Sequence, residues 1–436
     1  MINVVSLLAF TSALSIFSYF LHQVAFLFFL LIIVSFFISL FDKNKRVYIS
    51  KDIIIMMSML EIPFLIGVLL TNDLYFRESK DLMAMLLFSL FIVPLSAYLT
   101  DRDSQREFMY KTMNYIQYIG LFFAIFGFIK FAFLINGIKL SFLPTNHGVY
   151  GLGTSIGADN NIYALGLIVT FGIMLFNNPK KKKYFFEFFR YLMITVIVLA
   201  IILSASRRGV LFLALIIVWI WMRSMWSFFF KMITMRFKLT KRHFVFLLFI
   251  LFSATIIIKS GIAKDEKIFS NITAKFETIQ TLNKGEGGSF GPRIIRWKYS
   301  EELIGNYKLV QLLFGNGFRY NENFGKKFEE GMSDGYPHNI LLSCIHYSGF
   351  IGLFFEFVFI YIFSTILIKS FYFYDDIEKQ YCLITILITI VYLLYGLTSG
   401  NTIFEIRPLI IFSFIFMVIY NKKNDAYGLK GLVQHE

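Results

Sequence analysis

Apolar residues recur along the whole chain in long runs, separated by short polar and basic segments. Each run is about 15 to 25 residues long, which as a helix is enough to cross roughly 30 Å of hydrocarbon. A helix is expected because it satisfies its backbone polar groups within the segment. The pattern predicts about twelve membrane-spanning helices, at 2–20, 24–41, 53–70, 82–99, 115–135, 161–176, 191–205, 209–222, 244–258, 339–368, 381–397 and 407–420.

The composition supports this interpretation. Of 436 residues, 57% are hydrophobic and 16% are charged, whereas a soluble domain carries about 25% charged residues. The first apolar run has neither a basic segment before it nor a small-residue cleavage site, so we expect a retained helix rather than a signal peptide. The fold class expected is therefore an all-α integral membrane protein.

The positions of lysine and arginine predict the orientation. With the N-terminus in the cytoplasm, most basic clusters fall on the cytoplasmic side, as the positive-inside rule requires. The chain then divides into helices one to nine, a large extracytoplasmic loop, the last three helices and a cytoplasmic tail, at 1–258, 259–337, 338–420 and 421–436. The net charge of +14 is explained by contact with anionic membrane lipid and indicates no nucleic acid partner.

A few cationic residues break the orientation rule, and all of them fall at the outer interface. Arg207 and Arg208 lie in "SASRRGV", between two spans, and Arg407 lies in "EIRPL" at the start of the last span. Any single outer arginine has the alternative of snorkelling to lipid headgroups. Two adjacent arginines at the end of an apolar hairpin are costly unless they face a cavity or a partner.

The large outer loop contains an amphipathic segment, "GPRIIRWKYSEELI". Pro292 is typical of a first helical turn, so the segment is predicted to be a helix. Arg293 and Arg296 would then lie one turn apart on one face. The loop therefore adds further guanidinium groups at the same depth.

A group of arginines at this depth is suited to a lipid-linked diphosphate. Guanidinium groups bind phosphate oxygens bidentately and keep their charge. A glycosyl transfer outside the cytoplasm also needs a donor that arrives activated, and a polyprenyl diphosphate is such a leaving group. The arginines expected to hold it are Arg207, Arg208, Arg293 and Arg407. Since the outer segments show no DxD and no close His/Glu cluster, we expect no metal and no cofactor.

His338 follows Pro337 at the start of the tenth predicted span. We expect it in the first turn of that helix, where the positive end of the dipole favours a neutral imidazole. A neutral imidazole accepts a proton from a sugar hydroxyl, which is general-base catalysis. The alternative is a structural role, which is the more common one for a lone histidine. His346, about two turns deeper, is expected to be a packing residue with a hydrogen-bonded ring.

At these residues the chain resembles the O-antigen ligase and polymerase superfamily. "HNILLSCIHYSGFIG" is similar to its His–Asn–Gly–Gly motif, and "SASRRGVLFLAL" to its Ser-x-Ser-Arg-Gly segment with one extra arginine. That extra residue leaves open whether Arg207 or Arg208 is the equivalent. "GPRIIRW…LLFGNGF" resembles the loop portion, and "TSIGADNNIYALGLIV" the Gly…Asn-Asn region. The matching residues are His338, Asn339, Gly349, Gly352, Gly209, Arg293, Gly315, Gly317 and Asn160.

The resemblance implies a metal-independent, GT-C-like glycosyltransferase in the bacterial cytoplasmic membrane. Its substrates would be undecaprenyl-diphosphate-linked oligosaccharides at the periplasmic or outer face, and membrane lipid and a chain-length regulator would be its partners. His338 and Arg293 are the implied catalytic residues. Further candidates for substrate contact are Arg296, Arg319, Asn339, Asn160 and Tyr336. Four aromatic residues of the loop either stack on sugars, form the core of the loop or belong to an aromatic belt at the membrane interface. They are Trp297, Tyr307, Tyr320 and Tyr336.

Three functions remain open on the sequence. An O-antigen polymerase, joining lipid-linked repeat units, is favoured because "GADNNIYALGL" and "SRRGV" look closer to polymerase segments. The alternative within the family is an O-antigen ligase, which transfers the finished glycan to lipid A–core. The alternative from another class is a flippase or transporter for the same lipid-linked oligosaccharide. Against transport, the two halves show no convincing repeat, and the arginines lie at the outer edge rather than at the midplane.

Overall fold

The computed structural model describes residues 4–17, 30, 51–70, 99, 102–140, 151, 153–157, 159–176, 184–233, 291–328, 335–373 and 376–399. Within these ranges every regular element is a helix, which confirms the all-α prediction for this part of the chain. The helices are α1 (Val4–Ile16), α3 (Lys51–Leu69), α5 (Arg102–Ile135), α6 (Asn160–Phe176), α7 (Tyr184–Ile202), α8 (Arg207–Ile233), α11 (Gly291–Gly305), α12 (Leu309–Phe314), the short 3₁₀ helix η4 (Gly317–Arg319), α13 (Tyr320–Lys327), α14 (Ile340–Phe373) and α15 (Asp376–Ser399).

Each predicted span that the structure describes contains a helix, and several of these helices extend beyond the predicted bounds. The expected spans at 24–41, 82–99, 244–258 and 407–420 lie almost wholly outside the described residues. Among those described, Asp103–Ile135 and Ile340–Ile362 are long and apolar enough to cross a membrane. Shorter apolar helices are Val5–Leu14, Ser58–Leu69, Asn160–Phe176 and Leu383–Leu397.

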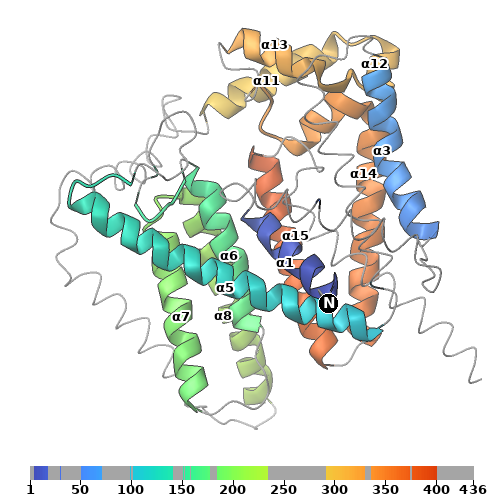
Figure 1. Ribbon diagram of the computed structural model, residues 1–436. Coiled ribbons are helices and arrows are strands. Elements are labelled where there is room, and N and C mark those ends of the chain that lie inside the picture. The colour runs from blue at the N-terminus through green and yellow to red at the C-terminus, as the bar shows by residue number, and fades with distance from the viewer. Residues whose placement is uncertain are drawn as a thin grey trace, which may run out of the picture. The chain divides into compact units, whose positions relative to one another are not determined.

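The chain forms two compact units. One comprises residues 1–116 and 289–436, and the other comprises residues 117–288. In the first unit, α11, α12 and α13 lie together at one end of α3 and α14 (Figure 1). In the second unit, α6 packs against both α7 and α8 (Figure 1).

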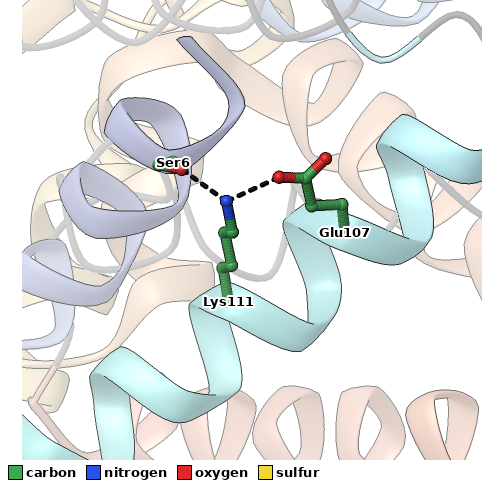
Figure 2. Close-up of polar contacts among 3 residues, drawn as sticks. All are labelled: Ser6, Glu107 and Lys111. Atoms are coloured by element: carbon green, nitrogen blue, oxygen red, sulfur yellow. Dashed lines mark hydrogen bonds and ion pairs between the residues drawn. The ribbon is translucent and has the colours of Figure 1, made fainter. Parts of the chain in front are cut away.

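Within the first unit, the α1 and α5 helices are joined by a polar contact. Lys111 Nζ on α5 donates to Ser6 Oγ on α1 at 2.6 Å and forms an ion pair with Glu107 Oε1 at 2.5 Å (Figure 2). Glu107 and Lys111 are one turn apart, the spacing at which opposite charges stabilise a helix. The α5 helix starts at Arg102, thirteen residues before the predicted apolar span. It therefore includes the charged residues that precede this span, which the charge pattern assigns to the cytoplasmic side.

Three backbones of the first unit meet at glycines. A Cβ on Gly67 of α3 would overlap the carbonyl of Tyr347 on α14 and lie 2.5 Å from Phe314 O at the end of α12. A Cβ on Gly349 of α14 would overlap the backbone of Leu313. Such approaches are possible only where a side chain is absent. The glycines therefore allow α3, α12 and α14 to pack backbone against backbone.

The backbone also turns at this crossing. Gly349 has φ +67° and breaks the helical geometry inside α14, and Gly315, which follows α12, has φ +78°. The adjacent Asn316 N donates to His346 O at 2.7 Å, which ties the turn to α14. The Gly-x-Gly that resembles the superfamily's loop segment thus serves to dock the turn after α12 on two apolar helices.

The packing agrees with the helix directions that the basic residues predict. Gly67, near the end of α3, lies against Tyr347, near the start of α14, so these two helices are antiparallel. A Cβ on Gly396, near the end of α15, would lie 3.5 Å from Ile340 at the start of α14. The ends that the charge pattern assigns to the outer side thus lie together within this unit.

We predict that Gly349→Ala destabilises the protein more than Gly137→Ala does. Both glycines have positive φ, so both variants lose about 1–2 kcal/mol from the left-handed conformation. Only Gly349 is crowded by another backbone, whereas a Cβ on Gly137 would meet nothing within 4 Å. The measurement is the midpoint of thermal unfolding in detergent. Equal losses for the two variants would show that the crossing is not tightly packed.

Candidate functional site

The motif histidine, His338, lies just before α14 rather than in its first turn. Asn339 Oδ1 accepts hydrogen bonds from the backbone N–H of Leu341 at 3.0 Å and of Leu342 at 3.3 Å. Asn339 is therefore the N-cap, and the helix begins at Ile340. The prediction that His338 occupies the first turn was wrong, because the amide side chain of the next residue already caps the helix. His338 instead adopts φ +56°.

The backbone that carries His338 is held by the outer loop. Arg296 is 4% exposed, and its Nη1 donates to Tyr336 O at 3.1 Å. Its guanidinium carbon lies 4.7 Å from the centre of the Phe328 ring, a cation–π contact. The Tyr336 ring in turn packs against the His338 ring, with 4.2 Å between centroids. Arg296, Tyr336 and His338 are therefore brought together, and Arg296 contacts protein groups.

The other candidates of the loop occupy different positions. Arg293 lies one turn before Arg296 on α11, as the sequence predicts, and is half-buried. Pro292 lies in the first turn of this helix, which confirms that prediction. Arg319 ends η4 and is exposed. Arg407 lies outside the described residues.

His346 is a packing residue, as predicted. Its ring is fully buried, with Nε2 2.7 Å from Ser300 Oγ and Nδ1 2.7 Å from Tyr307 Oη. The Tyr320 ring stacks on it at 4.8 Å between centroids. A neutral imidazole has one donor and one acceptor nitrogen, and the two hydroxyls satisfy both. Burial also raises the pKa of the Tyr307 phenol above its usual value, so this hydroxyl remains protonated as the contact requires.

These contacts decide the role of two loop aromatics. Tyr320 is fully buried, and Tyr307 is bonded to His346. Tyr320 therefore belongs to the core between α13 and α14, and Tyr307 is half-buried with its hydroxyl held by the same ring. Through Ser300 of α11 and Tyr320 of α13, His346 joins both loop helices to α14.

In the second unit, Arg207 and Arg208 form the first turn of α8. Ser206 is the N-cap, because its Oγ accepts the Gly209 N–H at 3.0 Å. The same Oγ donates to Asn161 Oδ1 at 3.0 Å. Gly209 also allows close packing, since a Cβ there would lie 2.5 Å from Ala164 Cβ. The first turns of α6 and α8 are thus held side by side.

The start of α6 is defined by a second cap. Asp159 Oδ1 accepts the N–H of Asn161 at 2.9 Å and of Ile162 at 3.2 Å. Asn160, the first residue of this helix, is 5% exposed, and its Oδ1 has no hydrogen-bond partner among the described residues. Helix N-termini carry partial positive charge and favour anions. The two first turns with Arg207 and Arg208 therefore form a cationic region in this unit.

Sequence reasoning missed Lys130. This lysine is buried on α5, and its ammonium donates to the carbonyls of Gly151, Gly153 and Ser155, at 2.7 Å and 2.8 Å for the last two. The three N–H groups of an ammonium match three acceptors. The signal was available in the sequence, because a lysine inside an apolar span is costly unless it has a role.

The loop that Lys130 holds also contacts the end of α7. Thr154 N donates to Leu203 O at 3.1 Å, and Thr154 Oγ1 donates to Ala200 O at 2.6 Å. These bonds fix the backbone just before Ser206 and the two arginines. Lys130 therefore supports the cationic region indirectly, through the loop.

A comparison with protein families adds to this geometry. Residues 191–357 match the family model described as O-antigen ligase. The chain contains a domain of the O-antigen ligase and polymerase superfamily. A comparison with curated proteins finds no match.

The matched range includes most of the candidate residues. The matched range holds the arginine pair of α8, the α11 arginines, and the segment from Tyr336 to Gly352. Asn160 and Lys130 precede it, and Arg407 follows it. Among the residues described, no group of three or more His, Cys, Asp or Glu is placed to hold a metal ion.

We predict that Lys130→Met destabilises the protein strongly, because three buried carbonyls lose their donor. One unsatisfied buried group costs about 1–3 kcal/mol. The control is Lys139→Met, which removes an exposed lysine beyond the end of α5. The unfolding midpoint in detergent should fall for Lys130→Met and change little for Lys139→Met. Equal midpoints would mean that the loop does not depend on the ammonium.

Proposed function

We propose that this protein is an O-antigen or surface polysaccharide polymerase of the bacterial cytoplasmic membrane. It joins undecaprenyl-diphosphate-linked repeat units at the outer face, on a GT-C-like scaffold of about twelve membrane helices. The observation that carries the proposal is His338. Within an O-antigen ligase domain, this histidine stands immediately before an apolar helix, on backbone fixed by Arg296.

His338 acts as the general base. Its imidazole removes the proton from the acceptor sugar hydroxyl while the hydroxyl oxygen attacks the anomeric carbon of the donor. The bond from that carbon to the diphosphate oxygen breaks, and undecaprenyl diphosphate leaves. General-base assistance of this kind contributes about 10²- to 10⁴-fold to a rate.

The leaving diphosphate gains negative charge as the bond breaks. Guanidinium groups stabilise that charge bidentately, and this role falls to Arg207, Arg208, Arg293 and Arg407. The N-termini of α6 and α8 support the same role for the first two. No metal or cofactor takes part in this scheme.

The remaining candidates divide into two kinds. Arg296, Tyr336 and Asn339 position His338, because they fix the backbone on both sides of it. Asn160 and Arg319 contact the substrate in this proposal. The buried amide of Asn160, at the start of α6 beside Asn161 and Ser206, supports its assignment.

The strained backbone at His338 supports a catalytic role. Positive φ is uncommon for residues other than glycine, and such conformations cluster at functional sites.

Two other functions of the protein remain alternatives. The O-antigen ligase reaction uses the same donor and the same base, and the matched family carries that description. Transport is the second alternative, and an assay in detergent distinguishes it from polymerisation. Detergent solution has no sealed compartment, so lengthening of lipid-linked repeats by the purified protein would show polymerisation and not transport.

We predict that the two histidines of the motif segment behave differently when replaced. His338→Ala should reduce polymer formation by 10²-fold or more and leave the unfolding midpoint nearly unchanged. His346→Ala removes two buried hydrogen bonds and a stacked ring, so it should lower the midpoint. Both variants are compared with the parent for amount inserted in the membrane. Near-normal polymer from stable His338→Ala would exclude the general base.

Deletion of the gene distinguishes polymerase from ligase. Loss of a polymerase should leave lipopolysaccharide cores with a single repeat unit, because transfer to the core still operates. Loss of a ligase should leave bare cores while polymer still accumulates on the carrier lipid. The measurement is a lipopolysaccharide gel together with analysis of the lipid-linked fraction. A full polymer ladder on the cores would contradict both functions.

A further inference from the structure

The short helix α12 exposes an apolar surface although it belongs to the segment predicted as extracytoplasmic. Leu309 is 71% exposed, Val310 52% and Leu313 38%. The neighbouring α11 exposes charged residues, Lys298 and Glu301, as well as the apolar Ile294 and Ile295. The exposed apolar residues of α12 therefore require an explanation of what covers them.

The crossing at the glycines fixes where α12 lies along α14. Leu313 and Phe314 meet the backbone of α14 at Gly349. Residues 343–349 of α14 are all buried, and exposed aromatic side chains begin at the next residue, with Phe350 and then Phe354. Gly349 lies nine residues into the candidate span Ile340–Ile362, about 13 Å along a helix. α12 therefore lies at the level where α14 begins to present apolar side chains outward.

The end of α3 adds apolar side chains beside the same crossing. Gly67 approaches Phe314 O, and Leu69 and Leu70, which follow it, are both exposed. Three elements that meet at one point thus each expose apolar residues. This continuity is what an element at the boundary of the hydrocarbon would show.

Several polar groups around α12 form hydrogen bonds within the protein, which favours contact with lipid. Gln311, the polar side chain of this helix, accepts the Lys308 N–H at 3.0 Å. Gly315 N donates to Gln311 O at 2.7 Å, and Asn316 N donates to His346 O at 2.7 Å. Gly315 and Gly317, where the chain leaves the helix, are buried. The non-helical backbone at this depth is therefore enclosed by protein.

We propose that α12 is inserted in the outer leaflet, with Leu309, Val310 and Leu313 in contact with the acyl chains of membrane lipids. The proposal rests on the membrane orientation given above and not on the catalytic roles. It makes the outer loop a partly embedded structure, anchored at α12 and exposed to water at α13 and at the charged residues of α11. The occupant of the apolar surface is lipid, in preference to solvent or another protein surface.

Single-cysteine labelling tests this placement in the full-length protein in vesicles. Cys382 is replaced by alanine, and Cys344 stays because it is fully buried. An environment-sensitive maleimide is attached at Leu309→Cys or Val310→Cys. The controls are Glu301→Cys on α11 and Lys326→Cys on α13, where the parent side chain of Lys326 is 73% exposed. Each variant is first checked for an unchanged unfolding midpoint.

Quenching by brominated phospholipid and by aqueous iodide then separates the outcomes. We expect labels at 309 and 310 to be quenched several-fold more by brominated lipid than labels at 301 and 326, with the reverse order for iodide. Labels at 309 and 310 that follow iodide would place α12 in water and overturn the proposal. Protection from both quenchers would mean that protein covers the surface, which also overturns it. Failure of the His338 assay would leave these results unaffected.

Discussion

The arrangement of the first unit depends on one constraint, the direct contact of three backbones at Gly67, Gly315 and Gly349. No side chain separates α3, the turn after α12, and α14 at this point. Packing so close leaves no room for adjustment by rotamer changes, since protein interiors are already close-packed. The segment that contains α12 is therefore fixed to α3 and α14 at a defined level.

The constraint extends from the crossing to His338 in identifiable steps. Asn316 at the turn bonds to His346 O, and the His346 side chain bonds to Ser300 on α11. One turn earlier on α11, Arg296 bonds to Tyr336 O, and the Tyr336 ring packs on His338. The two histidines thus have separate tasks. His346 fixes the loop, and that loop holds the backbone from which His338 projects.

The sequence was informative where the signal is local. Apolar runs predicted the described helices apart from α11, α12, η4 and α13, and Pro292 predicted the start of α11. The position of His346 in an apolar run predicted a hydrogen-bonded packing ring. The sequence was less informative where the cause lies elsewhere in the chain. The role of Gly67 depends on a backbone some 280 residues away in sequence, at Tyr347, and no local pattern reports such a contact. Lys130 was overlooked although its charge in an apolar run was visible, because its partners are backbone carbonyls that every residue has.

The position of His338 before the first turn of α14 changes what sets the direction of its ring. Within a first turn, the ring would project from regular helix and its direction would be set by the helix axis. Before the first turn, the direction of the His338 ring depends on the left-handed backbone of this residue. That backbone conformation is unfavourable by roughly 1–2 kcal/mol for a residue with a Cβ. That conformation persists only if its neighbours impose it. Here the cap at Asn339 fixes one side and the Arg296 bond to Tyr336 fixes the other. The loop helix α11 therefore does more for His338 than contribute a nearby cation, because it holds the segment in a conformation that the local sequence alone would not adopt.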